Sequence, residues 1–208
     1  MKPRVMSTFA AVAVGLALLA ACSSGDGGEE IDVQQWASDY NAGAAKITTA
    51  HFVTAQSTHL YGDPVESEGE GDLDMTDPSN TKVALDMTLA GIAVQMVSVD
   101  GKVYLNLGGT WSEQDPDAMS FNDMDPGFSD AQVAAIRKVV YRGDEDLAGT
   151  LTHRYTVTRD AQEVGASLGL AIDGDTVDYE IWVDDDWRRV KFTVSYTVDG
   201  EETSQTVT

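Results

Sequence analysis

The chain has 208 residues and carries 13 Lys and Arg against 35 Asp and Glu, a formal net charge of −22 at pH 7. This acidic excess excludes nucleic acid as a partner, because the phosphates would be repelled, and it disfavours docking of the folded domain on anionic lipid head groups. The chain has one cysteine, so no disulfide can form within it and burial alone must hold the fold.

The first 21 residues have the features of a secretion signal. Lys2 and Arg4 give a positive start, and residues 9–21 form an uncharged apolar run that is too short to span a bilayer comfortably. The run ends in Leu-Ala-Ala before Cys22, which resembles the lipobox of bacterial lipoproteins. We therefore predict that residues 1–21 are removed and that a lipid on Cys22 anchors the protein on the extracytoplasmic side of the cell membrane. An ordinary signal peptide with an incidental cysteine is the weaker alternative.

A tether and then a helix follow the predicted anchor. Removal of two basic residues leaves 11 basic and 35 acidic groups, a net charge near −24. Residues 22–30 are rich in Gly, Ser and acids, which predicts a flexible tether that spans about 15 Å. Val33, Trp36 and Tyr40 recur at helical spacing, so we expect an amphipathic helix over residues 31–46.

The hydrophobic period changes to two after this helix. Five segments alternate and are rich in β-branched residues, namely residues 50–61, 65–76, 80–90, 92–100 and 101–107. Asp100-Gly101 separates the last two and is typical of a tight hairpin. The links are too short for parallel crossovers, so the pattern predicts an antiparallel meander.

The middle of the chain breaks this alternation. Residues 114–128 contain two prolines and several aspartates, which predicts a loop. The sequence from Ser129 has the spacing of a capping box. Ile136 and Val140 then fall on one helical face and Gly143 lies just beyond, so we expect a second helix here.

The last third predicts a strand, a short helix and further strands. Residues 149–159 alternate, and Asp160 opens a second capping signature for a helix that ends at Gly169. Three further strands are expected at residues 177–184, 187–199 and 203–207. These elements predict one α+β domain over residues 31–208, an antiparallel sheet with a few helices against its apolar face.

No motif singles out an enzyme, a metal or a cofactor; loose calcium binding by aspartate-rich loops and a carboxylate pair for glycoside hydrolysis stay open as weaker alternatives. Residues 165–169 match G-x-S-x-G around Ser167, but that nucleophile elbow needs a preceding strand and a later histidine, and the last histidine is His153. The three histidines lie far apart in the sequence, and Cys22 is assigned to lipid, so no zinc spacing exists. His153 alternates with Val157, where a histidine is more often a hydrogen-bonded core residue than a ligand contact.

Several motifs, and their order along the chain, resemble the LppX/LprAFG family of actinobacterial lipoproteins. They are the lipobox, Ala50-His51-Phe52-Val53, Asp100-Gly101-Lys102-Val103-Tyr104-Leu105 with Trp111, residues 149–157 and residues 179–184. The resemblance implies a fold similar to the LolA/LolB carriers: a curved antiparallel half-barrel with helices packed on its concave face over an apolar cavity. It also implies a lipid or glycolipid of the cell envelope as ligand.

Alternation identifies the residues that would line such a cavity. They are Val83, Leu85, Met87, Leu89, Val103, Leu105, Tyr155, Val157, Tyr179, Ile181, Phe192 and Val194. For any single one of these residues, a place in a filled core is the favoured interpretation. We hypothesise a membrane-anchored lipid carrier, with mobile helices or the 114–128 loop gating access. The alternative is a cavity-less module that binds a protein partner through its acidic face or through exposed Trp182 and Trp187.

Overall fold

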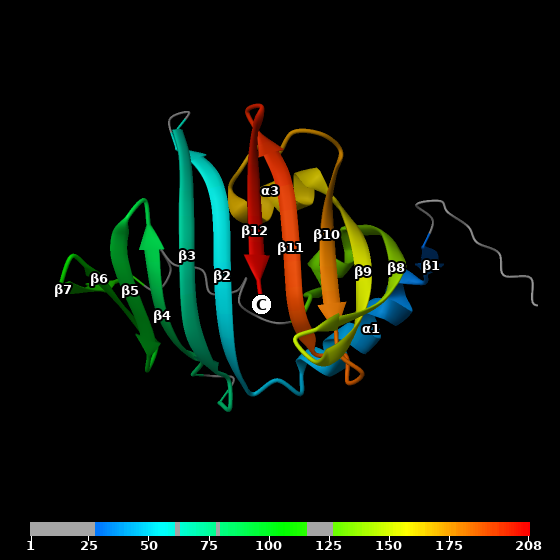
Figure 1. Ribbon diagram of the computed structural model, residues 1–208, viewed down its shortest axis with the longest axis horizontal. Helices are drawn as coiled ribbons and strands as arrows, with labels where there is room; N and C mark the ends of the chain where they lie inside the picture. Colours follow the sequence, from blue (N-terminus) through cyan, green and yellow to red (C-terminus); the bar gives the residue numbers. More distant parts are fainter. Residues whose placement is uncertain (1–27, 61–62, 78–79, 116–126) are drawn as a thin grey trace, which may run out of the picture.

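The computed structural model describes residues 28–60, 63–77, 80–115 and 127–208. These residues form one 12-stranded antiparallel sheet and three short helices (Figure 1). The predicted signal peptide, Cys22 and most of the predicted loop lie outside the described residues. No helix in the described ranges is long and apolar enough to cross a membrane.

The elements follow one another along the chain with short connections. They are β1 (Glu29–Ile31), α1 (Val33–Ala44), β2 (Thr49–Leu60), β3 (Asp63–Asp74), β4 (Lys82–Leu89), β5 (Ile92–Val99), β6 (Lys102–Leu107), β7 (Thr110–Gln114), α2 (Asp130–Ala134), β8 (Ile136–Leu147), β9 (Thr150–Asp160), α3 (Ala161–Leu168), β10 (Thr176–Val183), β11 (Arg189–Val198) and β12 (Glu201–Val207). The sheet order is β1-β8-β9-β10-β11-β12-β2-β3-β4-β5-β6-β7. The last strand therefore lies inside the sheet, between β11 and β2 (Figure 1).

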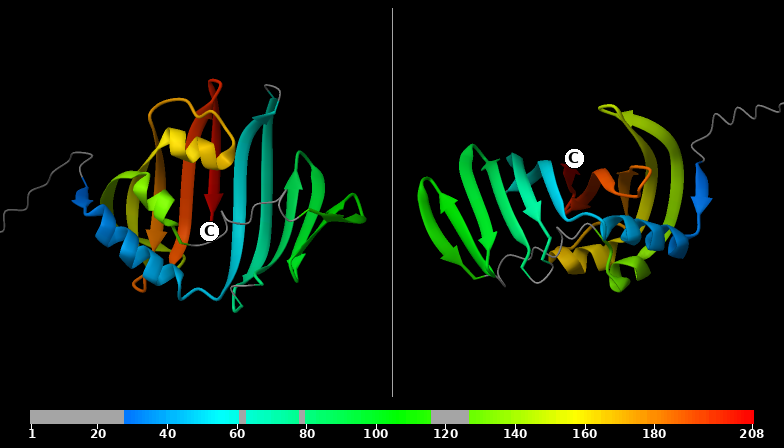
Figure 2. Two further views of the ribbon diagram at one scale, coloured as in Figure 1. Left: turned by 180° about the vertical axis from the view of Figure 1, so that it is seen from behind. Right: turned by 90° about the horizontal axis from the view of Figure 1, so that it is seen from below.

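The three helices lie on one face of the sheet (Figure 2), which we call the helix face; the opposite side is the outer face. Trp36 and Tyr40 of α1 are buried against Val157 and Ile181 of the sheet. The short helix α3 packs separately, through Val164. Burial of these large side chains is the main stabilisation that the helices contribute.

Polar caps fix the ends of the helices. Asp32 accepts a hydrogen bond from the backbone N–H of Gln35 at the start of α1. Asp160 accepts hydrogen bonds from the first backbone N–H groups of α3, and Gly169 ends that helix in the left-handed conformation. Each cap satisfies backbone groups that have no partner within the helix.

The predicted second helix is wrong beyond its first turn. The capping box at Ser129 is present, but α2 ends at Ala134 and residues 136–147 form strand β8. The pairing register of β8 shifts between Ile136 and Lys138 and again between Tyr141 and Gly143. Each β-bulge adds a residue. The first one separates the core-facing Ile136 and Val139 by three positions instead of two, a spacing that also occurs on one face of a helix.

The predicted tether also ends too late. Glu29 and Glu30 form part of β1 and pair with Val140 and Tyr141 of β8. An acidic three-residue strand carries almost no alternation, so β1 could not be predicted from the sequence. The Asp100-Gly101 hairpin is as predicted, because both residues have positive φ, at 53° and 71°.

Candidate functional site

The twelve predicted lining residues all lie on the helix face. Directly opposite residues of an antiparallel pair project to the same side of a sheet. One row of opposite residues therefore crosses nine strands on this face: Tyr155, Ile181, Phe192, Val207, Thr54, Gly69, Met87, Val94 and Leu107. Alternation requires only that the twelve residues share a face of the sheet. Their role in ligand binding stays a prediction.

The structure divides the twelve residues into two groups that do not meet. The covered group lies under the helices on β9–β11 and contains Tyr155, Val157, Tyr179, Ile181, Phe192 and Val194. The open group lies on β4 and β6 and contains Val83, Leu85, Met87, Leu89, Val103 and Leu105. β11 and β4 are four strand steps apart, about 19 Å at the usual strand spacing.

The strands between the two groups present several small and polar side chains on the helix face, beside the apolar Phe52, Leu73 and Val207. This polar belt consists of Thr54, Gln56, Ser67, Gly69 and Gln205. The register places Gln205 opposite Gln56, and Gln56 opposite Ser67. The apolar surface is therefore partly interrupted near the middle of the helix face, which alternation within single strands does not reveal.

The covered group is a packed core. Val157, Ile181 and Val194 are 0%, 2% and 5% exposed. Aromatic rings fill the space beneath α1: the Trp36 and Tyr40 rings stack at 5.0 Å, and Tyr155 stacks on Trp187 at 5.7 Å. These residues hold the helices in place.

The open group is only partly buried. Val83 and Val103 are 2% and 1% exposed and form a cluster of their own with Leu73 and Met96. Toward one end of the strands burial is lost, and Leu89, Ile92 and Leu107 are 44%, 57% and 52% exposed. We call these three residues, with Met87 and Val94, the open patch. No helix in the described part of the chain packs on it.

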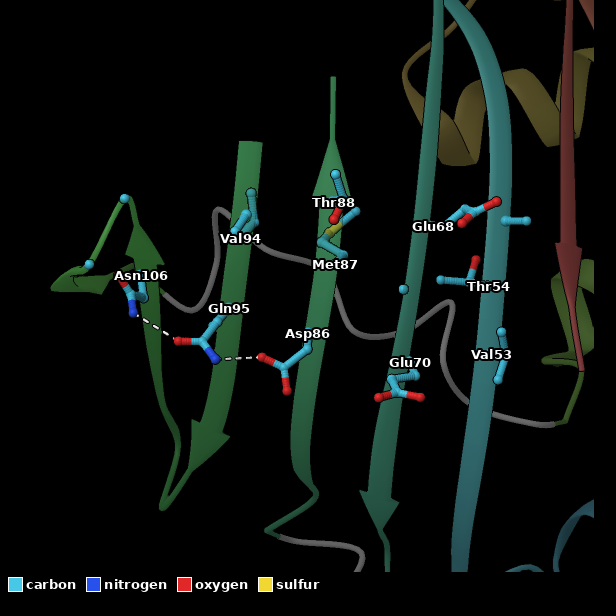
Figure 3. A pocket seen from close by; sticks show the side chains of 15 residues that line it. Val53, Thr54, Glu68, Glu70, Asp86, Met87, Thr88, Val94, Gln95 and Asn106 are labelled. Atoms are coloured by element: carbon cyan, nitrogen blue, oxygen red, sulfur yellow. Dashed lines mark hydrogen bonds between the residues drawn. The ribbon is translucent and has the colours of Figure 1, made fainter. Parts of the chain in front are cut away.

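A hollow of about 830 Å³ lies on the outer face, over β2–β6 (Figure 3). Asn106 donates a hydrogen bond to Gln95 at 2.9 Å, and Gln95 donates to Asp86 at 2.6 Å. Glu68 and Glu70 add two carboxylates to its lining, and Met87 is the one predicted lining residue that borders it. The sequence interpretation missed this hollow, although every second residue of β3 from 66 to 74 is acidic.

His153 is hydrogen-bonded on both sides but is not a core residue. Its side chain is 30% exposed, and Nδ1 lies 2.6 Å from Asp144 Oδ1 while Nε2 lies 3.0 Å from Asp185 Oδ1. Burial alone would lower the pKa of His153, but hydrogen bonds to the two carboxylates outweigh it and raise that pKa. The Tyr141 hydroxyl also donates to Asp144, at 2.5 Å, which raises the pKa of Tyr141 to about 12.

Trp182 is not exposed, contrary to prediction. It is 5% exposed on the outer face, with the Arg154 guanidinium 5.2 Å and the Lys191 amine 4.6 Å from its ring. Its indole N–H donates to Glu145 at 2.8 Å. Trp187 is half-buried against Tyr155. The two tryptophans therefore offer no common exposed surface for a protein partner.

The G-x-S-x-G match is a helix end. Ser167 lies within α3, and its hydroxyl donates to the Val164 carbonyl at 2.7 Å. A nucleophile elbow would instead place the serine on a sharp turn after a strand. Among the residues that the structure describes, no group of three His, Cys, Asp or Glu could hold a metal ion.

Comparisons with known proteins identify similar sequences and folds. A family model described as LppX_LprAFG lipoprotein matches residues 32–208. LprF from Mycobacterium bovis is 17% identical, with a TM-score of 0.59 over 85% of this chain and 91% of that one. LppX from Mycobacterium tuberculosis is 13% identical, with a TM-score of 0.60 over 84% and 94%. At these identities the structural likeness shows the fold alone, and it confirms the predicted LolA-like α+β fold. No curated protein matches the sequence.

Proposed function

We propose, from the premise that the chain belongs to the LppX_LprAFG lipoprotein family, that it is a membrane-anchored carrier of lipid or glycolipid. Members of this family are non-enzymatic carriers. The cargo would bind without covalent chemistry, on the helix face of the sheet. The lipid on Cys22 would hold the domain at the extracytoplasmic surface of the cell membrane.

The open patch is the observation that carries this proposal. Leu89, Ile92 and Leu107 are about half exposed on a face that is otherwise used for packing. Covering such residues with an acyl chain removes apolar surface from water, at about 0.8 kcal/mol per buried methylene. Directional chemistry is unnecessary for that work.

The polar belt supports the same proposal. A lipid has an apolar and a polar part, and the helix face offers both within a few strands. Acyl chains would lie on β4–β6, and hydroxyl groups of a sugar or glycerol would hydrogen-bond to Thr54, Gln56 and Gln205. The side chains of the covered group would pack against α1 and α3 and fix these helices on the sheet.

Native mass spectrometry with lipid extraction tests the proposal. Residues 1–22 are replaced by a soluble secretion signal, and the protein is purified from an actinobacterial host. We expect near-stoichiometric co-purifying lipid. A clean apo mass, together with no uptake of phospholipids or glycolipids offered in vitro, would overturn the carrier assignment and favour a protein-interaction module.

A further inference from the structure

Arg159 is the one charged residue that is buried in the described part of the chain, at 5% exposure. It is near the end of β9, where its backbone pairs with Ile136 of β8 and Val177 of β10. Like Val157, two positions earlier, it projects from the helix face. An arginine keeps its proton at any physiological pH, so the helix face carries a permanent buried positive charge.

No acidic partner neutralises Arg159 among the described residues. Its guanidinium lies 5.6 Å from the Phe128 ring and 5.3 Å from the Tyr179 ring, and Nη1 reaches the Tyr179 hydroxyl at 3.4 Å. Its Nε is buried and makes no hydrogen bond. The stacking offsets part of the desolvation of the guanidinium, but the buried Nε–H remains without an acceptor.

Other arginines of the chain do find carboxylates. Arg137 pairs with Asp160, and Arg154 pairs with Glu180 at 2.7 Å. The sequence contains 35 acidic residues, so acidic groups are abundant. Burying a charge without its counterion is strongly unfavourable, so Arg159 requires an anionic group from beyond the described residues.

The surroundings of Arg159 indicate what that group is attached to. Phe128 packs on Trp36 and Tyr40 under α1, while Tyr179 contacts both this cluster and the one under α3. The guanidinium is thus embedded in aromatic and aliphatic side chains, between the two places where helices cover the sheet. A free ion would gain nothing from these neighbours, but the apolar part of an amphiphile would.

We propose that Arg159 binds the anionic group, phosphate or carboxylate, of the carried lipid. The planar guanidinium fork matches two oxygens of either group. The inference rests on the proposed function and narrows its cargo to anionic lipids. The acyl chains would leave the aromatic rings and continue along the helix face.

The test compares lipids that differ only in the head group. The full-length protein, purified in a non-ionic detergent, is offered phosphatidic acid and diacylglycerol with the same chains, and retention is measured by native mass spectrometry. We expect at least tenfold better retention of phosphatidic acid by the wild type. Arg159→Met should lose that preference and keep diacylglycerol, and Arg159→Lys should keep part of it.

Two controls separate binding from folding. Arg154→Gln removes one charge from the same strand on the outer face and should leave the preference unchanged. Arg159→Met should have a Tm equal to or above that of the wild type, because a buried unpaired charge is replaced by an apolar side chain of similar length. Lost binding with a retained Tm cannot come from misfolding.

The outcomes distinguish failure of the inference from failure of the carrier function. Equal retention of both lipids by wild type and Arg159→Met would overturn the role of Arg159 and leave the carrier function standing. Retention of neither lipid would overturn both. A rise in wild-type Tm with inorganic phosphate alone, absent in Arg159→Met and without any lipid preference, would assign the site to free anions and overturn the lipid assignment.

Discussion

The imidazole of His153 bridges to Asp185, with 3.0 Å between Nε2 and a carboxylate oxygen. This contact joins β9 to the turn between β10 and β11. In that turn Asp184 accepts hydrogen bonds from two backbone N–H groups, and its carboxylate pairs with Arg188 at 2.7 Å. The turn is therefore held internally by Asp184 and externally by His153.

The first prediction concerns pH. The pKa of His153 is raised in the folded state, so its contribution to stability is full below its unfolded pKa of about 6.5 and is lost as pH rises through the folded pKa. We expect the Tm difference between wild type and His153→Gln to be largest at pH 5.5 and to shrink by pH 8.5. Thermal unfolding followed by circular dichroism at several pH values measures it.

Asp144, Asp185 and Tyr141 are the titratable groups that surround His153. The pKa of Asp144 is lowered, chiefly by the hydrogen bond from the Tyr141 hydroxyl. The contribution of Asp144 to folding stability is therefore lost only as pH falls into the acid range. Tyr141 titrates near pH 12. Asp144 and Tyr141 therefore keep their charge between pH 5.5 and 8.5. An effect of His153→Gln on Tm that does not vary with pH would contradict the raised pKa of His153.

The second prediction concerns Trp182. Replacing it with alanine leaves a cavity between Arg154 and Lys191 and should cost about 3–5 kcal/mol of unfolding free energy. Trp182→Phe keeps most of the packing but removes the indole N–H that donates to Glu145. We expect this variant to lose about 1–2 kcal/mol of unfolding free energy. Urea denaturation followed by circular dichroism checks both. A cost below 1 kcal/mol for alanine would mean that this side chain is exposed in solution.

The third prediction concerns the contact of α1 with the 184–188 turn. A Cβ atom at Gly43 would overlap the backbone carbonyl oxygen of Trp187. Gly43→Ala should therefore destabilise the domain by about 1–3 kcal/mol through overpacking, although alanine is the better helix former. Ala42→Gly, one residue earlier on the exposed side of α1, should cost about 1 kcal/mol through helix propensity alone. A stabilised Gly43→Ala protein would show that α1 moves freely away from the turn.

The fourth prediction concerns the open patch. Ile92→Lys places a charge among Met87, Leu89 and Leu107 and should reduce lipid uptake at least tenfold, with a change in stability within about 0.5 kcal/mol because Ile92 is 57% exposed. Val53→Lys is the matched control, since Val53 is 48% exposed on the outer face. Equal uptake by the two variants in the native mass spectrometry assay would place the cargo elsewhere.

Much of the sheet could be predicted because alternation within a strand is local. The odd residues from Val83 to Leu89 face the core side whatever the neighbouring strands are, so their common face could be predicted from β4 alone. Strand β8 could not be predicted in this way, because its two bulges change the spacing of Ile136, Val139 and Tyr141 along the strand. A bulge is visible only when the partner strand is known.

The candidate site could be predicted only in part, for the same reason. The polar belt depends on Gln205 lying opposite Gln56, a pairing of residues far apart in the sequence that neither strand encodes. The burial of Arg159 was equally hidden, since an arginine near a strand end is normally exposed. Its separation from the carboxylates of the described residues becomes apparent only once Phe128 and Tyr179 are placed around it.

The place of β12 between β11 and β2 has a consequence for how a chain synthesised from its N-terminus acquires this fold. The N-terminal meander β2–β7 and the later hairpins are synthesised before β12, each with an unpaired inner edge. The two halves are joined only when β12 arrives, so the centre of the sheet is completed last. Open strand edges invite pairing with other chains, and this late closure leaves the two inner edges at β11 and β2 open until the C-terminal strand is available.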